Sequence, residues 1–287
     1  MTVSSSRPRS TIGRPITLVL AALALVLGLL AAGAGSASST SGEGHGQAAP
    51  KPTIVLVHGV FADASGWNAT IERLQRAGYP VIAPANPLRN VTDDSAYISS
   101  VVDTIPGPVI MVGHSYGGAV ITNAALGHAN VKALVYIGAF APDQGETALG
   151  LADRYPGSKL KEALLTRDFP LPGGSGHDTD GYIAADRFHD VFAQDLSRST
   201  TRLMAATQRP GSLGGLSTPS GVPAWKSIPS WYLIPTADNV IPPAVQHFMA
   251  ERAGSHVTEV RRASHVVMMS QPGATVKIID SAHRATR

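Results

Sequence analysis

The sequence predicts an α/β fold, in which a mostly parallel sheet is flanked by helices and carries an inserted helical lid. Short apolar runs, typical of strands buried on both faces, alternate with helical segments along the chain. With 287 residues, 44% of them hydrophobic and 15% charged, the chain can bury the core of one large domain. A glycine-rich stretch at 141–227 interrupts the alternation, and its length indicates an insertion.

The first 37 residues are predicted to be a signal peptide, so we expect a protein secreted to the periplasm or the medium. A basic start precedes an apolar run at 16–30, and small residues that suit a cleavage site follow it. The alternative is an uncleaved membrane anchor, because the apolar stretch 16–34 approaches the roughly 20 residues that span a bilayer. Residues 38–51 are expected to be a flexible linker and 52–287 the folded domain.

The charge and cysteine counts narrow the function classes. Three of the 23 basic residues precede Glu43, and the remaining 20 balance the 20 acidic residues. This balance gives no reason to expect nucleic acid as a partner, and we expect membrane contact only through the N-terminal segment. The chain has no cysteine, which excludes disulfides, thiolate metal sites and cysteine catalysis. The composition leaves the oligomeric state open.

The first half of the domain is predicted to alternate regularly between strands and helices. Continuous apolar runs predict strands, and the segments between them predict helices that end at glycine or proline. Thr92 or Asp93 suits the cap of the second helix. The expected strands are 53–59, 81–84, 109–114 and 131–140, and the expected helices are 68–77, 93–105 and 117–127.

The insertion and the last part of the chain complete the predicted architecture. Two helical patches are expected inside the insertion, at 158–167 and 186–207. Right-handed crossovers would place the carboxyl ends of the strands at one edge of the sheet, so polar residues that follow strands are the candidates for chemistry. After the insertion, strands are expected at 230–236 and 256–262, and helices at 242–253 and 272–284.

A candidate nucleophile stands between the third predicted strand and its helix. The stretch 113–117, GHSYG, matches the pattern G-x-S-x-G in the strand-turn-helix context that this pattern requires. Such a sharp turn, called a nucleophile elbow, lifts the serine hydroxyl clear of the sheet. The helix N-terminus directs backbone N–H groups to the same space. We therefore predict Ser115 as the nucleophile. The alternative is a loop serine that caps the next helix.

A serine hydroxyl needs a base to take its proton, and the elbow pattern places this histidine late in the chain. His265 follows the last predicted strand, on the edge where Ser115 emerges. His247 falls inside a predicted helix, His256 begins a strand at the wrong end of the sheet, and His283 lies in the C-terminal helix. His265 is therefore predicted as the base; its alternative role is a histidine that bonds nearby backbone at a helix start.

The acid that orients the histidine should also follow a strand. Asp238 comes directly after the strand 230–236 on the correct edge. Asp143, with Glu146 close by, is the rival because it follows the fourth strand on the same edge. The usual order of nucleophile, acid and histidine favours Asp238. Its alternative role is an Asx turn with Asn239.

Two backbone amides are predicted to form the oxyanion hole. One is the amide of Tyr116, directly after the nucleophile, and the other is the amide of Val60, after the first strand. Gly59 allows the chain to turn inward there, and His58 is expected to hold this loop by hydrogen bonds. No second ligand stands at metal spacing from His58, so we expect no metal, and no phosphate-binding glycine loop indicates a cofactor.

Together these stretches resemble the α/β-hydrolase superfamily. The resemblance rests on LVHGVFADASGW, GHSYGG, PTADNVIPP and SHVVMMSQP, which cover the beginning, middle and end of residues 53–282. The HG…W opening and the S-H-x-x-M-x-S-x-P ending are similar to the branch of plant methylesterases, hydroxynitrile lyases and bacterial secreted esterases. Hydroxynitrile lyases of that branch typically carry threonine and lysine where this chain has Gly59 and Val266, so the resemblance implies ester hydrolysis.

The implied activity is hydrolysis of small carboxylic esters through an acyl-enzyme on Ser115, without a cofactor. Aromatic side chains are candidates for an apolar substrate pocket, although a core role is an equal alternative for each. Two other functions remain open: a cofactor-free perhydrolase or haloperoxidase on the same triad, and a ligand-binding protein that is not catalytic. The candidate pocket residues are Phe61, Phe140, Phe188 and Phe192.

Overall fold

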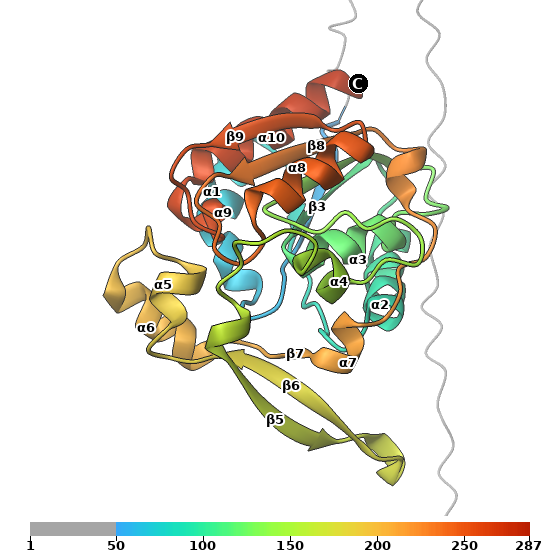
Figure 1. Cartoon of the computed structure of the whole chain (residues 1–287). Coiled ribbons are helices and arrows are strands. Elements are labelled where there is room, and N and C mark those ends of the chain that lie inside the picture. Colours follow the sequence, from blue (N-terminus) through green and yellow to red (C-terminus); the bar gives the residue numbers. More distant parts are fainter. Residues whose placement is uncertain (1–49) are drawn as a thin grey trace, which may run out of the picture. The chain divides into compact units, whose positions relative to one another are not determined.

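The computed structural model describes residues 50–287, and the predicted signal peptide, the alternative anchor and most of the linker lie outside this part of the chain. The described residues form a parallel sheet with helices on both faces, from which a second, smaller sheet projects (Figure 1). Within this part of the chain, no helix is long and apolar enough to cross a membrane.

The main sheet has six strands in the order β2-β1-β3-β4-β8-β9, and all neighbours are parallel. The three central strands are almost completely buried, as the continuous apolar runs predicted. Each predicted strand of this sheet is confirmed within a few residues of its bounds. The strands are β1 (Thr53–Val57), β2 (Val81–Ile82), β3 (Val109–His114), β4 (Val131–Ile137), β8 (Ser230–Pro235) and β9 (His256–Val260).

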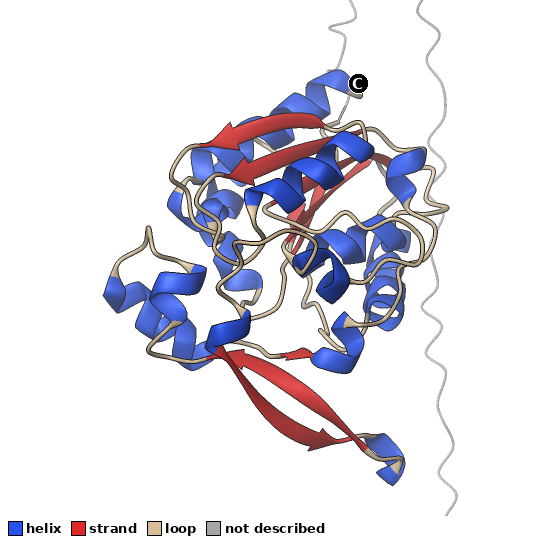
Figure 2. Ribbon diagram, in the orientation of Figure 1, coloured by secondary structure: helices blue, strands red, loops and turns tan. Residues whose placement is uncertain are grey.

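Helices cover both faces of this sheet (Figures 1 and 2). α1 packs on α10, and α2 packs on α3. The five longer predicted helices outside the insertion are confirmed, and short helices flank the site as η1 (Ala64–Trp67) and α9 (Val267–Ser270). The five are α1 (Asn68–Arg76), α2 (Val91–Asp103), α3 (Tyr116–Ala124), α8 (Pro243–Arg252) and α10 (Pro272–Ala285).

The cap of α2 differs from the prediction. Asn90, rather than Thr92 or Asp93, has extended backbone, and its side chain accepts a hydrogen bond from the amide of Asp93 at 2.9 Å. The helix therefore begins at Val91. Asparagine caps helices as well as aspartate does, so the neighbouring polar residues offered three chemically similar starting points.

The inserted region, residues 141–227, is only partly helical, which corrects the prediction of a helical lid. The expected helical patch at 158–167 is wrong, because strand β5 (Leu164–Pro170) pairs there with β6 (His177–Ile183) in an antiparallel hairpin. The glycines between the two strands form its tip (Figure 2). The patch at 186–207 is confirmed as two helices. The region also holds α4 (Ala148–Ala152), α5 (Phe188–Phe192), α6 (Arg198–Thr207), β7 (Gly211–Ser212) and α7 (Leu213–Leu216).

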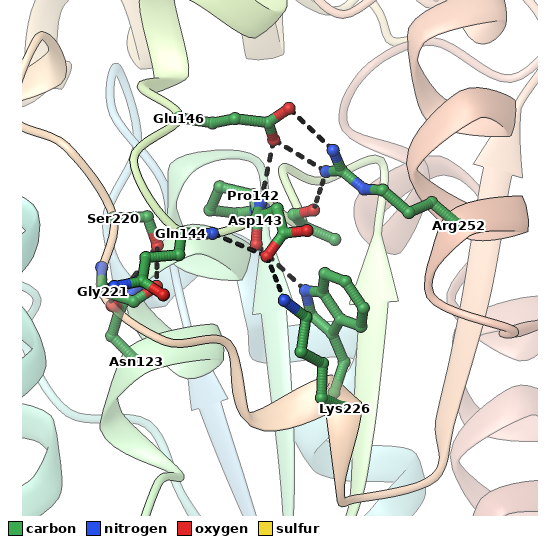
Figure 3. A network of polar contacts seen from close by, with 11 residues as sticks. Asn123, Pro142, Asp143, Gln144, Glu146, Ser220, Gly221, Lys226 and Arg252 are labelled. Carbon is green, nitrogen blue, oxygen red and sulfur yellow. Dashed lines mark hydrogen bonds and ion pairs between the residues drawn. The ribbon is translucent and has the colours of Figure 1, made fainter.

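A polar network fastens the two ends of the inserted region to each other and to the main domain (Figure 3). The amide of Gly145 donates to the carbonyl of Ser220, and the amide of Ser220 donates to the carbonyl of Glu146, both at 2.8 Å. The guanidinium of Arg252, in α8, donates to both carboxylate oxygens of Glu146 at 2.7 Å. Asn123, in α3, holds the Ser220 end. The insertion therefore leaves and rejoins the sheet at one fixed base.

Candidate active site

Ser115 lies at the sharp turn between β3 and α3. Its φ of 54° and ψ of −126° are unusual for a residue with a side chain, so the turn is strained. The carbonyl of Ser115 accepts hydrogen bonds from the amides of Gly118 and Phe140, both at 3.0 Å, which hold the turn closed. Its side chain makes no helix-capping hydrogen bond, so the alternative role of a capping serine has no support.

The glycines on either side of Ser115 are required by close backbone contacts. A Cβ atom at Gly113 would lie 2.6 Å from the carbonyl oxygen of Gly117, and one at Gly117 would lie 2.3 Å from the carbonyl oxygen of Val57. Real Cβ atoms do not come so close to other atoms. The start of α3 therefore rests directly on the end of β1, and the pattern G-x-S-x-G has a steric cause here.

His265 and Asp238 are brought together at the same edge of the sheet. Nδ1 of His265 and Oδ2 of Asp238 are 2.8 Å apart, and both side chains are fully buried. Because the carboxylate accepts, Nδ1 carries the hydrogen and Nε2 is left free to take a proton. Nε2 is buried and has no hydrogen-bond partner within residues 50–287. This is the arrangement that a general base requires.

The carboxylate of Asp238 is held by four donors. Oδ1 accepts from the amides of Val240 and Ile241 at 2.8 and 3.0 Å, and Oδ2 accepts from Nε2 of Gln246 at 2.8 Å as well as from His265. The bond to Val240 is an Asx turn, the alternative role for Asp238, and the same carboxylate also contacts His265 through its other oxygen. Gln246 was not predicted from the sequence, because nothing in the pattern of α8 sets it apart from an ordinary helix residue.

The residues considered and set aside on sequence grounds, one aspartate and three histidines, have other partners in the structure. Asp143 forms an ion pair with Lys226 at 2.6 Å, and Lys226 is the main cause that lowers the pKa of that carboxyl. His247 pairs with Glu259 at 2.9 Å on the surface. The ring of His256 lies against Trp231, and His283 bonds Tyr79.

The loop after β1 is fixed by His58. The amide of Asn86 donates to Nε2 of His58 at 3.0 Å, so Nδ1 carries the hydrogen and donates to the carbonyl of Gly59 at 2.9 Å. Burial lowers the pKa of His58, which keeps this neutral tautomer. The amides of Val60 and Tyr116, the predicted oxyanion donors, have no acceptor within the described residues and so remain free for a ligand.

Gly59 lies directly against Ser115. A Cβ atom at this position would be 2.6 Å from Cβ of Ser115 and 3.1 Å from its Oγ. The glycine thus lets the loop that carries Val60 approach the serine hydroxyl. Backbone contact between this loop and the elbow is what an oxyanion hole of two amides needs.

Two rings enclose His265. The ring of His114 lies 4.6 Å from it, and Nε2 of His114 lies 3.0 Å from the carbonyl oxygen of His265. Burial lowers the pKa of His114 well below its ordinary value, so this ring is neutral beside the base. Phe192, from the inserted region, lies 5.1 Å away on another side. The sequence placed His114 in the elbow but gave no signal of its contact with His265.

The predicted pocket residues divide into two groups, and all four are buried. Phe61, Phe188 and Phe192 form one aromatic cluster beside His265, with ring centres 5.0 to 6.1 Å apart. Phe140 pairs with none of these three rings among the described residues, and its backbone amide donates to the carbonyl of Ser115. A cavity of ≈ 370 Å³ lies in the inserted region, and none of the four phenylalanines lines it. Its walls come from α4, the segment 155–161, Leu164 and Leu213.

Residues 50–287 contain no cluster of three or more histidine or acidic side chains that could hold a metal ion. His265 and Asp238 are in contact, and Ser115 follows β3 at the same edge of the sheet, next to His114, whose ring lies against His265. No hydrogen bond joins Oγ of Ser115 to Nε2 of His265 among the described residues. Such bonds are often long before substrate binds and shorten in the complex.

Comparison with known proteins agrees with the fold. Residues 54–278 match the model of the alpha/beta hydrolase family. Polyneuridine aldehyde esterase from Rauvolfia serpentina is 25% identical over 245 residues, covering 78% of this chain and 93% of its own length. Alpha-hydroxynitrile lyase from Arabidopsis thaliana is 26% identical over 262 residues, covering 80% and 95%. The crystal structure of polyneuridine aldehyde esterase superimposes with a TM-score of 0.70 at 23% identity, covering 81% of this chain and 99% of that one.

Proposed function

The chain belongs to the alpha/beta hydrolase family, and on that premise we propose that it is a serine esterase that cleaves small carboxylic esters. Its relatives support a hydrolase, and they include an esterase and a lyase. The observation that carries the proposal is the 2.8 Å contact between His265 and Asp238, with Nε2 of His265 left unbonded at the edge where Ser115 emerges.

In the proposed reaction, Nε2 of His265 removes the proton of Ser115 as Oγ attacks the ester carbonyl carbon. Asp238 holds the imidazole in the correct tautomer and stabilises its positive charge. The amides of Val60 and Tyr116 donate to the oxyanion. His265 then gives its proton to the departing alcohol, and a water molecule, deprotonated by the same histidine, hydrolyses the acyl-enzyme to acid and free serine.

Gly59 favours hydrolysis over the lyase reaction. The contacts against Ser115 leave no room for a side chain at this position, where the resembling hydroxynitrile lyases typically carry threonine. Val266, fully buried, stands where those enzymes typically carry lysine and provides no charge. This site therefore lacks both side chains that the resembling hydroxynitrile lyases typically carry at these positions.

The proposal is tested by Ser115→Ala. We expect hydrolysis of short p-nitrophenyl esters to fall by about 10³-fold or more, because the nucleophile is removed while the remaining site stays folded. Labelling of the wild-type protein by an organophosphate, located by mass spectrometry, should map to Ser115 and be absent from the variant. Ser175→Ala, at the exposed hairpin tip, is the matched control. Unchanged hydrolysis in Ser115→Ala contradicts the proposal.

The cellular location belongs to the same proposal. We propose export, on the basic start and the apolar run of residues 1–37 alone. Mass spectrometry of the N-terminus of protein recovered from the medium or periplasm tests it, with a mature start near residue 37 as the expected result. A chain that keeps residues 16–34 and stays with the membrane contradicts cleavage.

A further inference from the structure

The inserted region contacts the loops that carry both His265 and Asp238. The carboxylate of Asp195, just after α5, accepts from the amide of Ser264 at 2.9 Å and from its hydroxyl at 2.5 Å. Ser264 is fully buried and directly precedes His265. Asp195 is itself exposed, so its charge stays in contact with water while both oxygens hold a buried residue.

Two further contacts join the same segment to the loop of Asp238. Nε2 of Gln194 donates to the carbonyl of Ala237 at 2.5 Å, and the side-chain amide of Asn239 donates to the carbonyl of Asp190 at 2.9 Å. These two partners stand directly before and after Asp238. Residues 190–195 of the insertion therefore bridge the loop of the acid and the loop of the histidine.

The two loops are also bonded to each other at this point. The amide of Ala237 donates to the carbonyl of Ala263 at 3.0 Å, one residue before Ser264. The ring of Phe192 packs against His265 from the same segment. The position of the imidazole relative to the carboxylate thus depends on a short chain of contacts that begins at Asp195.

We propose that Asp195 is a positioning residue: it fixes the loop of His265 through Ser264 and so sets the imidazole for proton transfer. The inference rests on the proposed esterase function and concerns the same site. Displacement of a catalytic group by about 1 Å can cost about 10²-fold in rate, so a bond one residue from the base is well placed to affect kcat. Substrate need not touch Asp195, so KM should change little.

The test compares Asp195→Ala with Asp190→Ala in the full-length protein. Asp190 is the matched control because its exposed carboxylate meets only His189 and Arg198, at 3.8 and 3.7 Å, and its backbone carbonyl is retained. We expect Asp195→Ala to lower kcat for a p-nitrophenyl ester by about 5-fold or more, with KM nearly unchanged and the melting temperature close to the wild type. Asp190→Ala should leave all three unchanged.

Two further variants distinguish positioning from a general effect on the fold. Asp195→Asn keeps one acceptor oxygen for the amide of Ser264, so it should recover part of the lost kcat. Ser264→Ala removes the hydroxyl donor. Asp195→Ala already breaks both hydrogen bonds to Ser264, so the double variant should be no slower than Asp195→Ala alone. Fully multiplicative losses would show that the two residues act independently and overturn the inference.

The remaining outcomes separate this inference from the proposed function. A wild-type protein that hydrolyses esters, combined with an unchanged kcat in Asp195→Ala, overturns the inference alone. A rise in KM at constant kcat also overturns it, because Asp195 would then act on binding. A wild-type protein that neither hydrolyses esters nor takes the organophosphate contradicts the proposed function, and the inference with it.

Discussion

Strands β3 and β5 differ in how they are held. Every residue of β3 is buried, and the strand lies between β1 and β4 in the middle of the main sheet. Most residues of β5 are exposed, and the strand pairs with β6 alone. The middle of the main sheet is thus positioned by apolar burial, while its edge strands β2 and β9 are more exposed. β5 lacks such burial, and the inserted region that carries it is held by buried side chains such as Phe188 and Phe192 together with polar contacts between residues far apart in the chain.

Gly117→Ala tests the close packing of the main domain, and it is expected to have the largest effect on stability. A Cβ atom there would meet the backbone of β1, which cannot move aside as a flexible side chain can. We expect the free energy of unfolding to fall by at least about 2 kcal/mol, measured by urea denaturation. Gly107→Ala is the control, since nothing lies within 4 Å of the added atom, and it should change stability by less than about 0.5 kcal/mol. Equal effects would contradict the steric role of Gly117.

A smaller loss of stability is expected from a substitution at the base of the inserted region, where its two ends are joined. Glu146→Ala leaves the guanidinium of Arg252 without its two-bond partner (Figure 3), and both side chains are only about a quarter exposed, at 26% and 21%. We expect a loss of about 1–2 kcal/mol. Hydrogen exchange of the amides of Gly145 and Ser220 should accelerate with it, because they join the two ends of the region.

The control for this prediction is Glu72→Ala, which breaks an exposed ion pair with Arg76 at 3.8 Å. Pairs of this kind contribute little, so we expect no measurable change in stability. If Glu146→Ala were equally neutral, the polar network would not be what fastens the inserted region, and the comparison between the two sheets would have to rest on packing alone.

The smallest expected effect is on the pH dependence of stability. Burial lowers the pKa of His114 well below its ordinary value of 6.5, so the folded protein binds fewer protons there than the unfolded chain. This contribution to stability is present above pH 6.5 and is lost as the pH falls below it. His114→Gln, which keeps a donor for the carbonyl of His265, should flatten the fall of the melting temperature between about pH 7 and about pH 5. His177→Gln, exposed near the hairpin tip, should leave the slope unchanged.

The difference between β3 and β5 also explains which parts of the molecule could be predicted from the sequence. The bounds that the sequence predicts for β3, 109–114, match the structure, because an unbroken apolar run followed by G-x-S-x-G has one consistent interpretation. The prediction of Asp238 as the acid follows from its place after β8, since parallel strands bring the residues that follow them to one edge of the sheet. Both inferences depend on local pattern and on a general rule of sheet topology.

Other features could not be predicted, because their causes lie in pairs of distant residues. Nothing near Leu164 distinguishes a strand from a helix until β6 pairs with it. Gln246, Asp195 and Ser264 are ordinary polar residues in the sequence, and they matter only because folding brings them beside Asp238 and His265. A single sequence contains no record of such pairings.

The glycines at the tip of the β5–β6 hairpin have a consequence for how this enzyme could diversify. Gly173, Gly174 and Gly176 have φ values of 74°, 71° and 123°, and atoms added to them would meet nothing within 4 Å. The strand β6 separates the tip in the sequence from residues 190–195, which contact the loops of His265 and Asp238. Replacing one of these glycines would strain the backbone because of its positive φ, but residues inserted at the tip would meet no packed neighbour, so new recognition surfaces can be acquired there apart from the site of Ser115, His265 and Asp238.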